Sequence, residues 1–330
     1  MPKLDIVSIG SATQDVFVSS DQTRLIRVQH TESEEVYLAY EYGAKVAVDH
    51  LFISTGGGAV NTAIAFAKLG LRSAAVSEIG QDDAGNMIER ALQERGVDVS
   101  MLVRNPDHST GYSVILTGPT GDRTVLVHRG AGSCLSHSDI DWDRVGEAGW
   151  VYLSSLSGES AALWHDVARW AVEAKVKLAI NPGSRQIGEG LDGLGDVLAA
   201  ADIIFVNKGE AYRFTGTEEH RGDADERAAA EVLHRAGCRR VVMTMGAEGA
   251  RAFDGEEHYY LPAPKVEVVS NLGAGDAFAS ACLAAIHYGL PLREALKAGA
   301  INAGSVVTST GATTALLDWA AIQSNLGHQG

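Results

Sequence analysis

The sequence contains few cysteines and is short of basic residues. Three cysteines occur among its 330 residues, and no two of them form a CxxC pair. This scarcity argues against a disulfide framework and a structural zinc site, and it fits a reducing cytoplasm. Lysine and arginine number 27 against 42 aspartates and glutamates, which gives a formal net charge of −15. Because nucleic acids and anionic membranes are bound through broad basic faces, we expect neither as a partner.

Long apolar runs and metal-binding histidine patterns are also absent. No apolar stretch approaches the roughly 18 to 20 residues that cross a membrane. The first residues, MPKLDIVSIG, carry an acid at Asp5 and no long apolar core, so they do not resemble a signal peptide. The 11 histidines show no HExxH spacing. With 45% apolar and 21% charged residues, the composition is that of a globular protein, which we expect to be cytoplasmic.

What the chain does contain is a regular alternation of short apolar strands and helices. Strands are predicted at residues 6–10, 73–79, 150–154, 177–181, 202–207 and 240–246. Helices are predicted after the glycines at 56–58 and over residues 82–95, 161–173, 225–236, 275–288 and 292–308. Repeated strand–helix units with apolar strands indicate an α/β protein, with a mainly parallel sheet covered on both faces.

Two β-rich stretches interrupt this alternation. Residues 16–55 hold two to four β-favouring segments separated by polar residues. In the stretch 106–130, residues 110–129 read as a hairpin, with one apolar strand on each side of the turn sequence GPTGD. The simplest architecture places both stretches together as one small sheet over the main domain.

The segment NLGAGDAF carries the strongest chemical signal, because a Gly-Ala-Gly loop runs directly into a helix. The peptide N–H groups of Gly273, Ala274 and Gly275 would precede the helical ladder at the positive end of the helix dipole, which favours a phosphate. Asp276 follows in the first turn, where a carboxylate would repel that anion. It is either the base for a hydroxyl that attacks the phosphate or an ordinary N-cap, and the local pattern does not choose between the two.

A glycine triplet at residues 56–58 precedes another helix. Adjacent glycines allow the backbone to approach a ligand closely, and Asn61, one turn into the helix, can donate to and accept from hydroxyl groups. The alternative is a flexible turn followed by a surface asparagine. No GK[ST] follows, so the segment is not a P-loop, and it is not a GxGxxG dinucleotide motif.

Three further segments lie at the expected carboxyl ends of strands, where open α/β sheets bind ligands. Glu210, in NKGE, could hold a magnesium ion, directly or through water. The alternative is an ordinary acidic residue at the start of a helix. The segment TMGAEG at residues 244–249 offers glycines to a nucleotide or is a plain turn. Asp15, in GSATQD, either accepts hydrogen bonds from sugar hydroxyls or is a turn residue.

Together and in this order, these segments resemble the PfkB (ribokinase-like) family of carbohydrate and nucleoside kinases over essentially the whole chain. GGGAVNTAIAFAKLG resembles the first signature of that family and NLGAGDAF the second. NKGE resembles its Asn-x-x-Glu motif, TMGAEG its nucleotide-binding glycine motif, and IVSIGSATQD its first strand with the substrate aspartate. The resemblance implies a single kinase domain over residues 1–330 with the ribokinase-like three-layer fold. Its mainly parallel central sheet would carry a small β-sheet lid formed by residues 16–55 and 106–130.

The same resemblance implies a phosphotransferase that uses ATP and Mg²⁺ and transfers the γ-phosphate to a hydroxyl of a small carbohydrate. Asp276 would be the base, and Gly273, Ala274 and Gly275 would form the anion hole. The implied substrate contacts are Asp15, Gly57, Gly58 and Asn61. The implied contacts with the nucleotide and its magnesium are Asn207, Glu210, Thr244, Gly246, Gly249 and Asn302, with Glu210 holding the metal through water. A nucleoside kinase of the same family and a ligand-binding regulator without turnover are the alternatives.

One departure from the family pattern concerns a second cation. The family usually reads Asp-Thr-x-Gly-Ala-Gly-Asp, and many members use the first aspartate to ligate a monovalent cation. Here Ser270 stands at that position and brings no charge, so we expect K⁺ activation to be weak or absent. Exposed strand edges of the lid can pair with a second copy, which predicts a homodimer through the lid.

Overall fold

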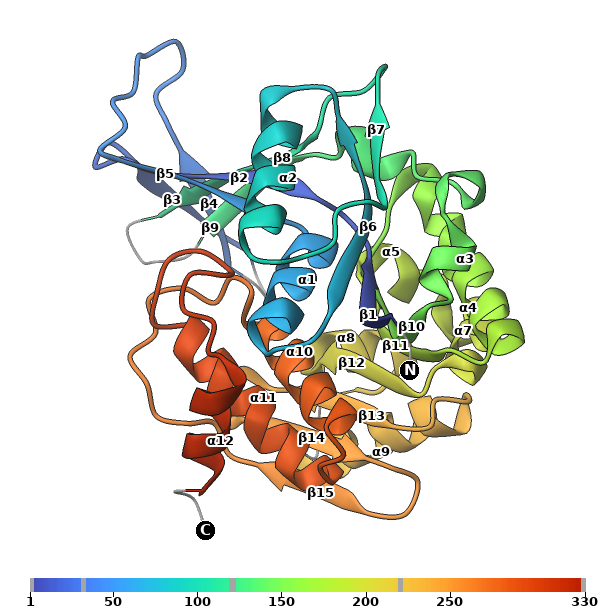
Figure 1. Cartoon of the computed structure of the whole chain (residues 1–330). Coiled ribbons are helices and arrows are strands. Elements are labelled where there is room, and N and C mark those ends of the chain that lie inside the picture. Colours follow the sequence, from blue (N-terminus) through green and yellow to red (C-terminus); the bar gives the residue numbers. More distant parts are fainter. Residues whose placement is uncertain (1–2, 31–33, 119–122, 219–221, 328–330) are drawn as a thin grey trace.

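The computed structural model describes residues 3–30, 34–118, 123–218 and 222–327 and is built around a nine-stranded sheet (Figure 1). Its strands lie in the order β15 (His258–Leu261), β14 (Ala250–Phe253), β13 (Val241–Thr244), β12 (Ile203–Asn207), β11 (Lys177–Asn181), β10 (Ala148–Ser154), β1 (Leu4–Ile9), β6 (Ser73–Gly80) and β7 (Leu102–Asn105). From β13 to β7 all neighbours pair in parallel, and β14 and β15 are antiparallel additions at one edge.

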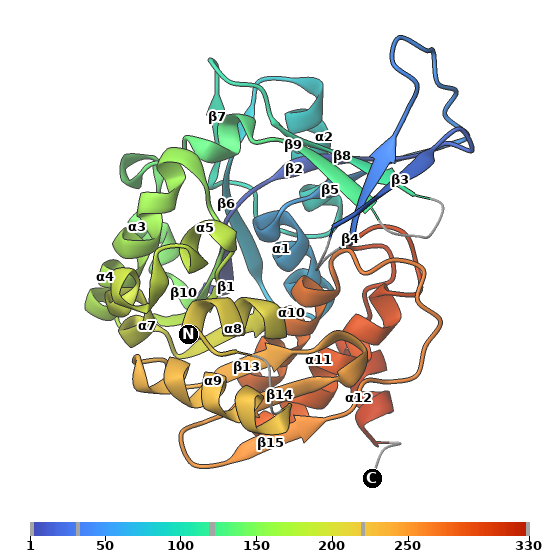
Figure 2. The ribbon, with the colours of Figure 1, turned by 180° about the vertical axis from the view of Figure 1, so that it is seen from behind.

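The central sheet is apolar on both of its faces. In β1, Val7 and Ile9 pack into one hydrophobic cluster while Ile6 packs into another on the opposite side. One face is covered by α3 (Trp142–Val145), α4 (Leu163–Ala174), α7 (Gly195–Ala200), α8 (Lys208–Thr215) and α9 (Asp223–Arg235). The other is covered by α1 (Gly58–Lys68), α2 (Asp83–Glu94), α10 (Ala274–His287), α11 (Leu292–Val306) and α12 (Trp319–Gly327). Figures 1 and 2 show the chain from opposite sides. The predicted α/β class, with a mainly parallel sheet between two helical layers and a smaller sheet beside it, is confirmed.

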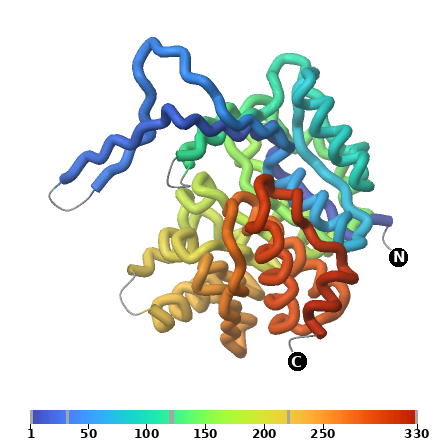
Figure 3. Tube along the Cα trace, turned by 90° about the vertical axis from the view of Figure 1, so that its left-hand side faces the viewer, coloured from blue at the N-terminus to red at the C-terminus, as the bar shows by residue number. Residues whose placement is uncertain are grey.

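A second, four-stranded sheet lies beside the helices α1 and α2. Its order is β5 (His50–Gly56), β2 (Thr13–Ser19), β8 (Gly111–Thr117) and β9 (Arg123–His128), with β2 and β8 parallel and the other pairs antiparallel. The expectation that all strands of residues 16–55 and 106–130 form one small sheet is wrong for β3 (Arg24–Gln29) and β4 (Glu34–Ala39). These two strands form a two-stranded sheet of their own that projects from the body in Figure 3. Their side chains are mostly exposed, so neither strand offers a buried face to a larger sheet.

The long helices agree with the predicted ranges, and the short ones were not predicted. Asp82 caps α2 as expected, because its side chain accepts the N–H of Gly85. The short α5 (Ser184–Ile187) and α6 (Gly190–Gly193) are single turns in which a 3.6-residue period cannot be recognised. Residues 119–122, which hold most of the GPTGD turn, lie outside the described residues. Among the described residues, no helix combines the length and apolar character needed to cross a membrane.

Candidate active site

Helix α10 begins with a glycine that no other residue can replace without local movement. Gly273 is the N-cap residue and has a φ of 74°. A Cβ at this position would lie 2.3 Å from the Cβ of Ala312. The first intrahelical hydrogen bond runs from the N–H of Ala277 to the carbonyl of Gly273 (2.8 Å). The N–H groups of residues 274–276 therefore donate to no carbonyl within the helix. The N–H of Ala274 makes a long 3.4 Å bond to the carbonyl of Asn271, so of these two predicted donors, Ala274 and Gly275, the second is the more open, while Gly273 is the third predicted donor.

Asp276 lies in the first turn of α10 and is not its N-cap. Its Oδ2 accepts a hydrogen bond from Nδ2 of Asn61 at 2.9 Å. Burial raises the pKa of Asp276 to about 6, against the lowering effect of the bond from Asn61. A carboxylate with a pKa near neutral is suited to accept a proton, which a fully exposed aspartate does poorly. The ordinary N-cap alternative therefore does not describe this residue.

Asn61 joins the glycine triplet to the carboxylate. It lies in the first turn of α1, where its own N–H bonds to the carbonyl of Gly57 at 2.9 Å. The side chain is buried, and its Oδ1 has no hydrogen-bond partner among the described residues. A buried amide oxygen without a partner is costly, so this atom is available to a hydroxyl donor beside Asp276.

A small pocket of about 190 Å³ lies next to the carboxylate, between the ends of three parallel strands and the start of α10. Its lining residues are Asn181, Phe205, Val206, Asn207, Glu210, Thr244, Gly273, Gly275, Asp276 and Phe278. Asn207 and Glu210 bond reciprocally at the start of α8, each side chain accepting the N–H of the other residue at 2.8 Å. Burial raises the pKa of Glu210. Glu210 is thus an acidic residue at the start of a helix, which was one of its two predicted roles. It also lines the same small pocket as Asp276.

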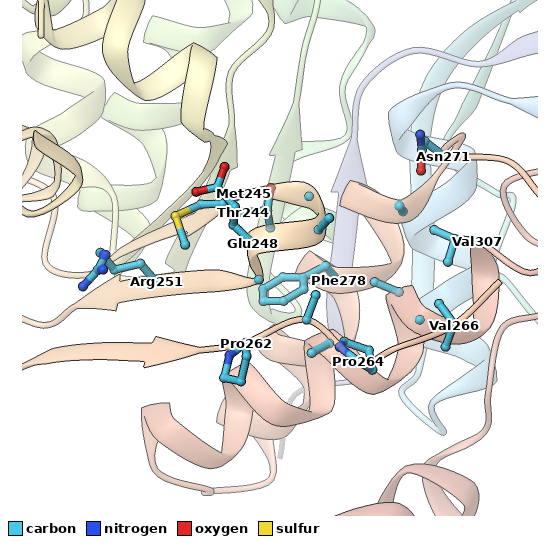
Figure 4. A pocket seen from close by; sticks show the side chains of 18 of the residues that line it. Thr244, Met245, Glu248, Arg251, Pro262, Pro264, Val266, Asn271, Phe278 and Val307 are labelled. Atoms are coloured by element: carbon cyan, nitrogen blue, oxygen red, sulfur yellow. The ribbon is translucent and has the colours of Figure 1, made fainter. Parts of the chain in front are cut away.

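A larger pocket of about 1440 Å³ adjoins the small one, and both are lined by Thr244, Gly275 and Phe278 (Figure 4). Apolar groups of Val266 and of α11 form much of its wall. Gly246 and Gly249 also line it and have positive φ values of 56° and 107°. A Cβ on Gly249 would lie 2.0 Å from the carbonyl oxygen of Leu261. A pocket with both an apolar wall and glycine backbone suits a ligand that has an apolar part and a polar part, as a nucleotide has.

Asn302 does not reach this pocket. Its side chain is fully buried in α11, where Nδ2 donates to the carbonyl of Ala277 (3.0 Å) and Oδ1 accepts the N–H of Leu317 (3.0 Å). Both bonds satisfy backbone groups of neighbouring segments. The residue therefore ties α11 to α10 and to the segment that precedes α12, and its implied contact with the nucleotide stays a prediction.

Asp15 and the glycine triplet meet at the base of the four-stranded sheet. Asp15 lies within β2 rather than in a turn, and burial raises the pKa of its carboxyl. A Cβ on Gly56 would lie 1.9 Å from Asp15 Oδ2, and one on Gly57 (φ 93°) would lie 2.4 Å from the carbonyl oxygen of Ser11. A Cβ on Gly58 would meet Ser154 Oγ at 2.4 Å. The glycines thus permit a close approach of Asp15, Ser11 and Ser154, which brings Asp15 of β2 next to the segment that leads into α1.

Sequence reasoning missed two residues that line these pockets, and one contact made by Arg123 near the start of α10. Asn181 ends β11 as Asn207 ends β12, so the strand-end rule could have identified it. Phe278 reads as an ordinary core residue of α10, yet it lines both pockets. Arg123 of β9 donates from Nη1 to Ser270 Oγ at 3.2 Å, across 147 residues of sequence. No local pattern could have predicted that contact.

Among the described residues, no group of three or more His, Cys, Asp or Glu side chains could hold a metal ion. The small pocket offers the oxygens of Glu210, Asn207 and Asp276. Such a set suits Mg²⁺, which keeps several waters and takes its remaining ligands from one or two carboxylates and a phosphate.

A model described as pfkB family carbohydrate kinase matches residues 5–319 of the chain. The aminoimidazole riboside kinase of Salmonella typhimurium is 31% identical over 279 residues, which cover 79% of this chain and 84% of that protein. The ATP-dependent ribose-1-phosphate kinase of Halopiger xanaduensis is 33% identical over 233 residues, covering 70% and 73%. Among solved structures, Arabidopsis thaliana ribokinase complexed with ribose and ATP superposes with a TM-score of 0.82 at 24% identity, covering 98% of both chains.

Proposed function

The chain belongs to the pfkB family of carbohydrate kinases, and on that basis we propose that it transfers the γ-phosphate of ATP to a hydroxyl group of a small sugar, with Asp276 as the base. The observation that carries this assignment is the position of Asp276. It combines a pKa of about 6, a hydrogen bond from Asn61 and a place on the wall of a pocket that continues into the larger cavity. The acceptor oxygen attacks the γ-phosphorus, the bond to the β–γ bridging oxygen breaks, and Asp276 takes the hydroxyl proton.

The other side chains would position the two substrates. We assign the anion hole to Gly273, Ala274 and Gly275, because the start of α10 presents N–H groups to an anion. Thr244, Gly246 and Gly249 would lie along the ATP molecule in the larger pocket. Asp15, Gly57, Gly58 and Asn61 would form the sugar side, since Asn61 lies in the first turn of α1 and Asp15 of β2 adjoins Gly56, two residues before that helix.

A magnesium ion fits the small pocket, with Glu210 holding it through water and Asn207 fixing Glu210. When bound, the magnesium ion would neutralise negative charge on the phosphates of ATP. Among the described residues that line the small pocket there is no lysine or arginine to offset that charge, and Glu210 and Asp276 add two carboxyl groups.

We also propose that residues 1–330 form one kinase domain whose lid comes from residues 16–55 and 106–130. A homodimer through this lid is supported by exposed apolar side chains on its strands, among them Val36, Tyr37, Leu51 and Leu126. A cytoplasmic location is supported by the cysteines, since Cys134, Cys238 and Cys282 are all free.

The test of the proposed function is a coupled ADP-release assay with Mg·ATP and a panel of pentoses, hexoses, sugar acids, sugar phosphates, inositols and nucleosides. The Asp276→Asn protein serves as the blank. A signal that depends on the acceptor and is missing in the blank supports the kinase. Silence over the panel with ATP still bound in calorimetry would favour a ligand-binding regulator.

The pH profile should show the titration of Asp276. Because its pKa is raised to about 6, the carboxylate loses its capacity to accept a proton below that pH. We expect kcat/KM for the acceptor to fall about tenfold per pH unit below this pKa. Asn61→Ala removes a hydrogen bond to the charged form, so it should move the acidic limb to higher pH. A limb that stays in place in this variant would contradict the pairing.

Potassium should have little effect on the rate. Ser270 Oγ accepts hydrogen bonds from Arg123 Nη1 and from the N–H of Leu272, both at 3.2 Å. A guanidinium at this position repels a second cation, and Ser270 itself brings no carboxylate to offset that repulsion. Replacing Na⁺ by K⁺ at constant ionic strength should change kcat by less than about twofold, because screening is then unaltered. A large gain in rate would show that the serine does not abolish the cation site.

A further inference from the structure

One face of the four-stranded sheet is directed at the core of the protein. Two contacts establish which face it is. Arg123 of β9 reaches Ser270 just before α10. The ring of Phe52 in β5 lies against Gly311, where an added Cβ would be 3.2 Å from Cε1 of the ring. Side chains in register with these residues share their face of the sheet.

The register places five large apolar side chains on this face. Phe17 pairs with Phe52 on one side and with Ile115 on the other, and Ile115 pairs with Val125. The neighbouring row contains Asp15, Ser113 and Val127. We call the set of Phe17, Phe52, Ile115, Val125 and Val127 the inner apolar face.

The inner apolar face is only partly covered. Ile115 and Phe17 are buried, with exposed fractions of 2% and 8%. Phe52, Val125 and Val127 remain 41%, 43% and 55% exposed, although they point toward the body. The rings of Phe17 and Phe52 lie 5.6 Å apart at 47°, which leaves an aromatic surface next to the carboxylate of Asp15.

The order of the groups follows from the backbone. Asn61, which holds Asp276, is one helical turn from Gly57, and Asp15 adjoins Gly56. A turn spans about 5.4 Å, so a sugar ring can lie between Asp276 and Asp15. The row of Phe17 and Phe52 follows one two-residue step along β2, about 7 Å farther out. A molecule with its reacting hydroxyl at Asp276 and other hydroxyls at Asp15 would therefore extend onto the inner apolar face.

We propose that the acceptor is a sugar bearing a planar, weakly polar ring, the chemistry of a nucleoside, with the sugar hydroxyls at Asp15 and the ring against Phe17 and Phe52. This rests on the kinase function proposed above. A free sugar carries hydroxyl groups around its whole rim and would leave some of them unpaired against the inner apolar face. An aromatic ring covers the same surface at no such cost.

The test compares Phe52→Ala with Leu51→Ala. Both residues are exposed and lie near the start of β5, and Leu51 pairs with Val18 on the opposite face, so it is a matched control for loss of apolar area. Wild-type protein should phosphorylate adenosine, inosine or cytidine with a higher kcat/KM than ribose, fructose or glucose. Phe52→Ala should raise KM for the nucleoside by about 5- to 100-fold, the range of base–aromatic stacking. Leu51→Ala should leave it unchanged.

A free sugar as the best substrate would overturn the proposal, and so would equal effects of the two variants. Loss of the kinase function is distinguishable from these outcomes. If no acceptor leads to ADP release, binding of the same nucleosides to the ADP-saturated protein is measured by calorimetry. Nucleoside binding that is weaker in Phe52→Ala would support the inner apolar face as the binding surface, while the proposed kinase function would be rejected. Absence of nucleoside binding would reject the proposed ligand.

Discussion

Replacing Asp276 by asparagine should lower kcat by about 10²- to 10⁴-fold, the range observed when a general base is lost. Asparagine keeps the size of the side chain and can still bond to Asn61, but it cannot take a proton from the acceptor hydroxyl. Both substrates should still bind, so the KM values for ATP and acceptor should change little. Initial rates of ADP release at saturating substrates measure the effect.

Asp83 provides the matched control for this experiment. It is also an acidic residue in the first turn of a helix, α2, but it is exposed and lines neither pocket. Asp83→Asn should therefore cost only the few tenths of a kcal/mol that a first-turn acid contributes, with kcat unchanged. If the two variants behaved alike, Asp276 would be a helix-start residue and not the base.

The start of α10 illustrates what the sequence can predict. The N–H groups at a helix end and a carboxylate in its first turn are local features, so NLGAGDAF alone indicates an anion site with a candidate base. The same holds for Glu210, whose position at a strand end brings it to the small pocket. The alternation of strands and helices likewise predicts the central sheet, because periodicity is a local signal.

Contacts between distant segments are beyond such reasoning. The missing Cβ atoms of the glycines at 56–58 make room for Asp15, Ser11 and Ser154, none of which is near them in the sequence. Asn302 bonds to backbone groups 15 and 25 residues away. In both cases the contacts depend on which segments of the chain become neighbours in the folded protein. Neither the spacing of glycines nor a single asparagine in the sequence indicates which segments these are.

The strand register of the four-stranded sheet determines which of its side chains face the core, and the composition of the strands does not. Residues 16–55 and 106–130 show alternating apolar residues, but alternation does not say which set faces the core. Pairing of Phe17 with Phe52 and Ile115 places three aromatic and aliphatic side chains beside Asp15. A shift of one residue would exchange this face with the one that carries Leu51 and Ile53. The choice of acceptor proposed here depends on that register.

Gly273→Ala should lower kcat by about 10²- to 10³-fold, the loss expected when a donor of an anion hole is misplaced. Alanine at a φ of 74° is strained, and its Cβ would lie 2.3 Å from that of Ala312. The loop must then move, and with it the N–H groups of Ala274 and Gly275. Because Asp15 and Asn61 belong to other elements, KM for the acceptor should remain within a few-fold of the wild-type value.

Thermal unfolding and kinetics together separate this effect from general damage to the fold. The strain of one left-handed alanine is about 1–3 kcal/mol, so Gly273→Ala should melt at a lower temperature yet remain folded at assay temperature. Gly195→Ala is the control, since Gly195 starts α7 and an added Cβ there meets no atom within 4 Å. It should melt no lower than wild type and keep full activity. A Gly273→Ala protein with near-normal kcat would mean that the phosphate is held by groups other than the start of α10.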